Sequence, residues 1–200
     1  MSAEQRPAVR GRPPSTTAEH IGRAALELFA ASGFEETTVD DIAQALGVGR
    51  RTIFRYFPSK NDMVWGDFDS VLQRLRNDLD AIDPDVPLME AIALAAVASN
   101  RYAPDQLPEL RLRMTLITTV PALQAHSMLR YADWRAVIAE YVARRTGRPV
   151  DDLFPQTIAH AALGVSVAAF SSWVHHPEQD VVDNLTVGYE LLATAWRAAP

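Results

Sequence analysis

The stretch that decides the fold reads TTVDDIAQALGVGRRTIFRYFPSK and occupies residues 37–60. Its first half predicts a short helix, because apolar residues recur at three- and four-residue steps and Thr38 precedes Asp41 in the spacing of a capping box. The Gly-Val-Gly run at residues 47–49 predicts a tight turn, since glycine tolerates backbone angles that other residues avoid. Residues 50–57 predict a second short helix that ends before Pro58. Together these elements form a helix-turn-helix.

The second helix of this motif has one apolar side and one cationic side. We expect Ile53 and Phe57 to pack against the first helix, whose apolar stripe consists of Val39, Ile42, Ala43 and Leu46. The other side chains then face outward, where such a helix meets base edges and phosphates in the major groove of DNA. The outward set comprises Arg50, Arg51, Thr52, Arg55 and Tyr56, and Lys60 follows at the start of the next helix. The alternative is an ordinary solvated basic face, which the coincidence with a capped helix and a glycine turn disfavours.

The charge distribution fits a single DNA-binding patch on an acidic protein. The formal net charge is −6, of which residues 1–60 contribute +1 and residues 61–200 contribute −7. Between residues 49 and 60 there are four basic residues and no acidic one. A polyanion would be repelled by the acidic bulk and would dock on this patch. The chain contains no cysteine, which excludes disulfides, thiolate catalysis and cysteine-ligated zinc.

Helical patterns continue to the end of the chain, and the sequence predicts an all-α protein of about nine helices. We expect a flexible basic arm at residues 1–14, a helix-turn-helix domain at 15–62, and a larger ligand-binding and dimerisation domain at 63–200. One long helix should start at Ser59 and continue through Leu79. The later helices are expected at residues 87–103, 105–119, 122–146, 152–176 and 178–198.

Residues 153–177 carry no Asp, Glu, Lys or Arg and are long enough to cross a membrane. Several polar residues interrupt this segment, so a helix buried between other helices is the favoured interpretation. The start of the chain, residues 1–4, is polar and does not resemble a signal peptide. We therefore expect a cytoplasmic protein.

Residues 37–43, 47–49 and 53–60 together resemble the DNA-binding domain of TetR/AcrR-type transcriptional regulators, and the resemblance extends over residues 16–65. It implies a homodimer that binds a palindromic operator and usually represses until a small effector enters the larger domain. It also implies phosphate contacts from Thr38, Tyr56 and Lys60, with base contacts from Arg50, Arg51, Thr52 and Arg55. Residues 50–62 and 64–68 further resemble the regulators found beside mycofactocin biosynthesis genes, which implies a response to long-chain acyl-CoA.

Two other regions carry candidate DNA or protein contacts. Arg10 and Arg12 flank a glycine and precede a proline, a pattern typical of arms that bind the minor groove; the alternative is a solubilising tail. The last two helices show stripes suited to a four-helix dimer interface, unless these stripes pack inside one subunit. The stripes consist of Ile158, Ala161, Val165, Ala168 and Ser172, and of Val182, Leu185, Tyr189, Leu192 and Trp196.

The middle helices offer residues for an adaptable apolar pocket, with plain core packing as the alternative for each of them. The candidates are Leu94, Val97, Met114, Ile117, Trp134, Val137, Ile138 and Phe170. For an acyl-CoA, phosphate contacts are expected from Arg101, Arg111, Arg113, Arg130 or Arg135. Five histidines occur without a metal-protease spacing, and the sequence contains neither a phosphate loop nor a nucleophile elbow, so we expect no enzyme and no cofactor. A DNA-binding dimer without any ligand is the alternative function.

Overall fold

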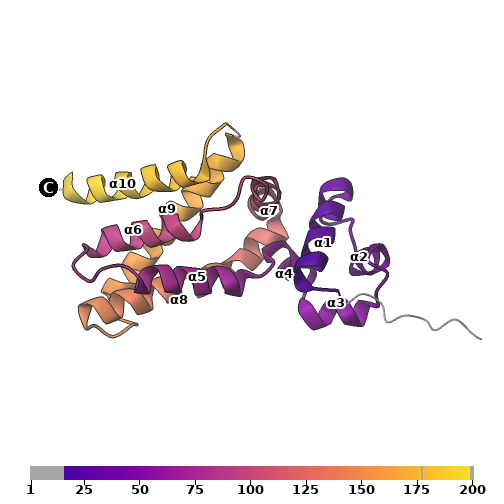
Figure 1. Cartoon of the computed structure of the whole chain (residues 1–200), viewed down its shortest axis with the longest axis horizontal. Coiled ribbons are helices and arrows are strands. Elements are labelled where there is room, and N and C mark those ends of the chain that lie inside the picture. The colour runs from indigo at the N-terminus through magenta and orange to yellow at the C-terminus, as the bar shows by residue number, and fades with distance from the viewer. Residues whose placement is uncertain (1–15, 177, 199–200) are drawn as a thin grey trace, which may run out of the picture.

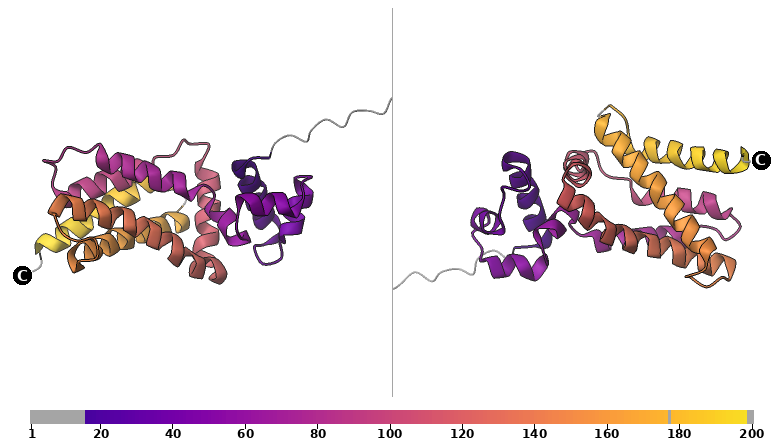
Figure 2. Two further views of the ribbon diagram at one scale, coloured as in Figure 1. Left: turned by 90° about the horizontal axis from the view of Figure 1, so that it is seen from below. Right: turned by 180° about the vertical axis from the view of Figure 1, so that it is seen from behind.

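The computed structural model describes residues 16–176 and 178–198, with the side chains of the last helix described up to residue 194. Within these ranges the chain forms ten helices and no strand, so the prediction of an all-α protein is confirmed. Figure 1 shows the first three helices and their connector at one end of an elongated molecule and a larger helical bundle at the other. The turned views of Figure 2 show the same division.

The first three helices are α1 (Ala18–Ser32), α2 (Val39–Ala45) and α3 (Arg50–Tyr56), and α4 (Lys60–Trp65) connects them to the bundle. The bundle consists of α5 (Phe68–Asp80), α6 (Leu88–Ser99), α7 (Leu107–Thr119), α8 (Pro121–Thr146), α9 (Leu153–His175) and α10 (Val181–Ala198). The prediction of one long helix from Ser59 through Leu79 is wrong, because α4 ends at Trp65 with Gly66 as its C-cap, and a new helix, α5, begins at Phe68. Gly66 has a φ of 60°, and Asp67 caps α5 by accepting a hydrogen bond from the backbone N–H of Ser70.

Two clusters of buried side chains hold the fold together. The first joins α1–α4 to the end of α7 and the start of α8, and its fully buried members include Ile21, Ile42, Ile53, Met63 and Leu123. The second lies inside the bundle and draws its buried members from α5 to α10, mostly from α5, α6 and the long helices α8, α9 and α10. Because Leu116 and Ile117 of α7 belong to the first cluster, the helix-turn-helix packs directly on the bundle.

The uncharged segment identified in the sequence forms α9. By length and composition it is the one helix of the described ranges that could cross a membrane. It packs along α8 and α10 and contributes Ala159, Ala162 and Trp173 to the buried core of the bundle. These contacts are those of a core helix in a globular protein.

Candidate DNA-binding and ligand-binding sites

The helix-turn-helix has the internal packing and the cap that the sequence predicts. Ile42, Ala43, Ile53 and Phe57 are all buried in one cluster, which fixes the angle between α2 and α3. The hydroxyl oxygen of Thr38 accepts a hydrogen bond from the backbone N–H of Asp41 at 3.2 Å, and the Asp41 carboxylate accepts one from the backbone N–H of Thr38 at 2.8 Å. The capping box is therefore confirmed.

The outward face of α3 is cationic and exposed at its N-terminal end. Arg50, Arg51 and Arg55 are exposed, while Thr52 and Tyr56 are half-buried. The Arg50 guanidinium donates a hydrogen bond at 3.1 Å to Asp40 of α2. This salt bridge lies at the surface and holds the arginine weakly, so the guanidinium remains available to a nucleic acid.

The other end of α3 is tied to the start of α1. The Tyr56 hydroxyl donates to the carbonyl of Thr16 at 2.7 Å and accepts from the Arg55 guanidinium at 3.2 Å. The Arg55 side chain also lies 4.9 Å from the centre of the Tyr56 ring. Residue 16 begins the described chain, and the predicted minor-groove residues Arg10 and Arg12 lie outside the described residues.

Lys60 connects α4 to the loop before α2. Its ammonium donates to the carbonyls of Phe34 at 2.7 Å, Thr37 at 3.1 Å and Glu35 at 3.5 Å, and it lies 4.2 Å from the centre of the Phe34 ring. An ammonium has three N–H bonds, so these carbonyls can use all of them. The predicted phosphate contact of Lys60 would require it to exchange one of these partners and stays a prediction.

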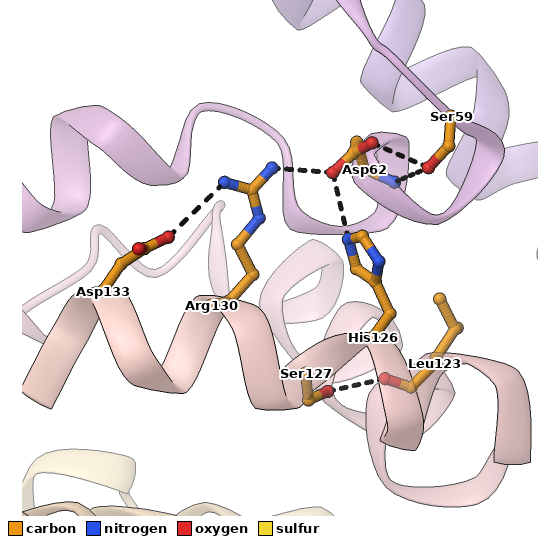
Figure 3. A network of polar contacts seen from close by, with 7 residues as sticks. All are labelled: Ser59, Asp62, Leu123, His126, Ser127, Arg130 and Asp133. Carbon is orange, nitrogen blue, oxygen red and sulfur yellow. Dashed lines mark hydrogen bonds and ion pairs between the residues drawn. The ribbon is translucent and has the colours of Figure 1, made fainter.

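A buried carboxylate joins α4 to α8 (Figure 3). Asp62 is 6% exposed and accepts hydrogen bonds from Arg130 at 2.7 Å and Ser59 at 2.7 Å, and it lies 3.0 Å from the ring nitrogen Nε2 of His126. Burial by itself would raise the pKa of Asp62, but the hydrogen bonds from Ser59 and Arg130 and the positive charges of His126 and Arg130 lower it overall. The contact between Ser59 and Asp62 is local, but the sequence carries no signal for the contacts of Asp62 with His126 and Arg130, which lie 64 and 68 residues away.

A cavity of about 560 Å³ lies where α4, α5, α7, α8 and α9 meet, which is the size of a site for a small organic ligand. Its apolar wall is rich in aromatic rings and consists of Trp65, Phe68, Val71, Leu110, Met114, Ile117, Tyr131, Trp134, Leu163, Val167 and Phe170. Its polar groups belong to Glu19, Asp67, Ser70, Arg74, Asn100, Tyr102, Gln106, Glu109, Arg113 and Ser166.

The structure brings together half of the predicted pocket residues. Met114, Ile117, Trp134 and Phe170 line the cavity. The other four do not: Leu94 is 50% exposed on α6, Val97 packs against the core, and Val137 and Ile138 are buried in it. A helix in a bundle presents apolar side chains to several neighbours, so helical spacing alone cannot identify the cavity side. Trp65 and Arg74 also line the cavity but precede the middle helices from which the sequence predicts the pocket.

The five arginines proposed for acyl-CoA phosphates take different places. Arg113 lines the cavity, and Arg130 pairs with Asp62. Arg111 lies 4.0 Å from the centre of the Trp173 ring and donates to the Trp173 carbonyl. Arg101 is exposed and Arg135 half-buried, and neither lines the cavity.

The predicted dimer stripes divide between the core and the surface. Ile158, Leu185 and Tyr189 are buried inside the bundle, where burial raises the pKa of Tyr189 to about 12. They therefore cannot face a partner. Ala168 and Ser172 are exposed, and the partly covered members are Ala161, Val165, Val182 and Leu192, while the Trp196 side chain lies outside the described residues. Val187 and Leu191, which the predicted stripes do not include, are 52% and 66% exposed on α10.

Family profiles match both parts of this architecture. The family profile described as "Bacterial regulatory proteins, tetR family" matches residues 21–64, and the one described as "MftR C-terminal domain" matches residues 86–197. A protein of Mycobacterium tuberculosis named for mycofactocin biosynthesis transcriptional regulation, MftR, is 43% identical over 91% of this chain and 92% of its own length. The HTH-type transcriptional regulator TcmR of Streptomyces glaucescens is 28% identical over 92% of this chain and 84% of its own length.

Solved structures share the fold at low sequence identity. SmeT, the repressor of a Stenotrophomonas maltophilia multidrug efflux pump, superposes with a TM-score of 0.61 at 17% identity and covers 92% of both chains. FadR of Thermus thermophilus, a transcriptional repressor in complex with lauroyl-CoA, superposes with a TM-score of 0.56 at 23% identity, covering 88% of this chain and 93% of its own. These likenesses establish the helical architecture of both domains.

Proposed function

Because this chain belongs to the TetR family of bacterial transcriptional regulators, we propose that it binds a palindromic operator as a homodimer and is released by a small hydrophobic effector. Its relatives are named as regulators, which confirms that the protein is not an enzyme. We propose that it acts in the cytoplasm, as a repressor, with a helix-turn-helix domain at residues 15–62 and a ligand-binding and dimerisation domain at 63–200.

The observation that carries this proposal is the position of α4 between the cavity and the DNA-binding helices. Trp65, the last residue of α4, lines the cavity. Lys60, its first residue, is bonded to the loop that precedes α2. A ligand that moves Trp65 therefore acts on a six-residue helix whose other end holds the helix-turn-helix. A ligand shifts the equilibrium between the DNA-binding and the released arrangement only if it binds one of them more tightly. Contact with α4 supplies this difference in affinity, because α4 joins the cavity to the DNA-binding helices.

For DNA recognition we propose that Arg50, Arg51, Thr52 and Arg55 read bases, and that Thr38, Tyr56 and Lys60 contact phosphates, with Arg10 and Arg12 in the minor groove. The exposed end of α3 supports the base contacts. For the effector we propose a long-chain acyl-CoA, which is supported by the match to the MftR C-terminal domain and by the apolar wall of the cavity.

Operator binding can be tested with the DNA upstream of the protein's own gene. We expect the double variant Arg50→Glu/Arg51→Glu to lose binding, because it replaces two cations by anions at the DNA surface. Arg148→Glu is the matched control, since Arg148 is also half-exposed but lies in the turn between α8 and α9, at the far end from α3. Fluorescence anisotropy at several salt concentrations measures the affinities. Unchanged affinity of the double variant would refute the proposed interface.

Dimerisation is proposed through the exposed apolar side chains of α10, since two recognition helices must be held roughly 34–36 Å apart to read two half-sites one DNA turn apart. Leu191→Glu should produce a monomer that binds the operator weakly. Leu129→Glu is the control, because Leu129 on α8 is exposed to nearly the same extent, 64% against 66%. Sedimentation velocity measures the oligomeric state, and a monomer from Leu129→Glu alone would place the interface elsewhere.

Ligand release can be tested by titrating oleoyl-CoA into the operator complex. A ligand at a hundred times its dissociation constant should also stabilise the free protein by about 2.7 kcal/mol. If a panel of acyl-CoA molecules neither releases DNA nor raises the melting temperature, the alternative of a ligand-blind DNA-binding dimer is favoured.

A further inference from the structure

Arg113 of α7 bridges the cavity and the C-terminal end of α4. It lines the cavity, its side chain is 17% exposed, and its guanidinium donates to the backbone carbonyl of Val64. A second hydrogen bond reaches the Glu109 carboxylate at 2.8 Å. The guanidinium lies against Gly66, where an added Cβ atom would stand 2.8 Å from the nearest Arg113 nitrogen. Glycine at this position therefore makes room for the arginine.

This contact caps a helix that is too short to be stable alone. The last carbonyls of any helix lack partners within it, and α4 has only six residues. The backbone N–H of Gly66 donates a hydrogen bond to the carbonyl of Asp62, and the carbonyl of Val64 accepts one from the Arg113 side chain of α7. A group in the cavity that competes for Arg113 would thus remove a cap from α4.

The hydrogen-bonding groups of the cavity favour an acceptor on the ligand. The indole N–H of Trp65 is fully buried and has no hydrogen-bond partner among the described residues, and the residue as a whole is 8% exposed. Because solvent does not reach this nitrogen, a ligand in the cavity can accept from it only after the Trp65 side chain shifts toward the cavity. Two of the three acidic groups of the cavity wall are already bonded: Asp67 accepts from Ser70, and Glu109 accepts from Arg113. The third, Glu19, is exposed to solvent. A buried donor without a partner is costly, so a ligand that supplies an acceptor gains affinity there.

Positive charge is also present at the cavity wall. Arg74 of α5 lines the cavity together with Tyr102 and Arg113, and the charges of both arginines act on the Tyr102 hydroxyl. Charge-assisted hydrogen bonds to a carboxylate or phosphate are stronger than those to neutral acceptors. A ligand with such a group can therefore replace the Val64 carbonyl as a partner of the Arg113 guanidinium.

We propose that the effector carries an anionic acceptor group, a carboxylate or a phosphate, that takes Arg113 from the Val64 carbonyl and accepts a hydrogen bond from Trp65. Its apolar body lies against Phe68, Met114 and Phe170. The proposal rests on the ligand response proposed above and adds its chemistry and route. Loss of the Arg113 cap and the new bond to Trp65 both act on α4, which holds the DNA-binding helices through Lys60.

Four probes with the same twelve-carbon chain separate the alternatives: dodecanoate, lauroyl-CoA, 1-dodecanol and dodecyltrimethylammonium. The three charged probes are used below their critical micelle concentrations and 1-dodecanol below its solubility limit. Release of operator DNA is followed by anisotropy. We expect dodecanoate or lauroyl-CoA to act at concentrations at least roughly tenfold lower than 1-dodecanol, the effect of a charge-assisted hydrogen bond. If dodecanoate releases DNA at the lower concentration, the acceptor is a carboxylate; if lauroyl-CoA does, the acceptor is a phosphate of coenzyme A. Equal potency of the alcohol, or greater potency of the ammonium, would overturn the proposal.

Variants test the route. Because Arg113→Met removes the same cap, it should weaken operator binding even without a ligand. In ligand binding followed by thermal shift it should abolish the preference for dodecanoate over 1-dodecanol, while Arg101→Met, an exposed arginine outside the cavity wall, should keep it. Trp65→Phe preserves an aromatic ring without the N–H and should weaken the anionic probe more than the alcohol. An Arg113→Met variant that retains the full preference would refute the role of this residue. If the unaltered protein binds no operator, the proposed function itself fails; if it binds operator but shows no preference among the probes, only this inference fails.

Discussion

Replacing Asp62 by asparagine tests whether the link between α4 and α8 stabilises the protein. The substitution keeps the shape of the side chain but removes its charge and one of its two acceptor oxygens. The remaining oxygen cannot serve both Ser59 on one side and Arg130 with His126 on the other. The variant therefore leaves the Arg130 guanidinium without its carboxylate in a site where that side chain is 24% exposed.

The size of the effect follows from these contacts. A hydrogen bond to a charged group contributes about 1.5–3 kcal/mol, and removing one partner of a buried ion pair costs about 3–5 kcal/mol. Because Arg130 is partly exposed, water can replace some of the lost interaction, and we expect a loss of about 2 kcal/mol in the free energy of unfolding. For a chain of this length, that corresponds to a melting temperature lower by roughly 4–8 °C.

Asp133→Asn is the matched control. Asp133 lies 3.9 Å from the same guanidinium but is 53% exposed, so its removal should cost less than about 0.5 kcal/mol. Thermal and urea unfolding followed by circular dichroism measure both variants, and an unchanged denaturant slope ensures that the same surface is exposed on unfolding. If Asp62→Asn costs no more than Asp133→Asn, the network does not stabilise the interface between α4 and α8.

Three further outcomes follow from the structure. The pKa of Asp62 is lower in the folded protein than in the unfolded chain, so its contribution to the free energy of unfolding is complete above the ordinary aspartate pKa of 3.8 and is lost as the pH falls through the lowered value. In Asp62→Asn, the free energy of unfolding should therefore fall less steeply with decreasing pH in that range. Thr38→Ala removes the cap of α2 and should lower the free energy of unfolding by about 1 kcal/mol. Relative to the unaltered protein, hydrogen exchange should accelerate more in α2 than in α9; equal acceleration in both helices would argue against a local effect. Gly147 ends α8 with a φ of 66°, so Gly147→Ala should destabilise by about 1 kcal/mol in urea unfolding and Gly147→Asn by less, whereas equal losses would mean that backbone strain is not the cause.

The sequence by itself determined the local structure of the DNA-binding helices. The cap at Thr38, the turn at Gly47 and the stop at Pro58 act within a few residues, so their spacing predicts α2 and α3 without knowledge of the rest of the chain. The break at Gly66 was equally local, since a glycine followed by a capping aspartate ends one helix and starts another. It was missed because the apolar pattern continues across it from Trp65 to Phe68.

Only the tertiary structure decided which residues meet across the bundle. Arg113 reaches Val64 over 49 residues and Arg130 reaches Asp62 over 68, and such pairings depend on how whole helices pack. In α10 apolar residues occur on several sides, so spacing alone did not separate buried Leu185 from exposed Leu191. Helical periodicity identifies apolar faces, but the neighbour that each face covers is selected by packing of the complete fold.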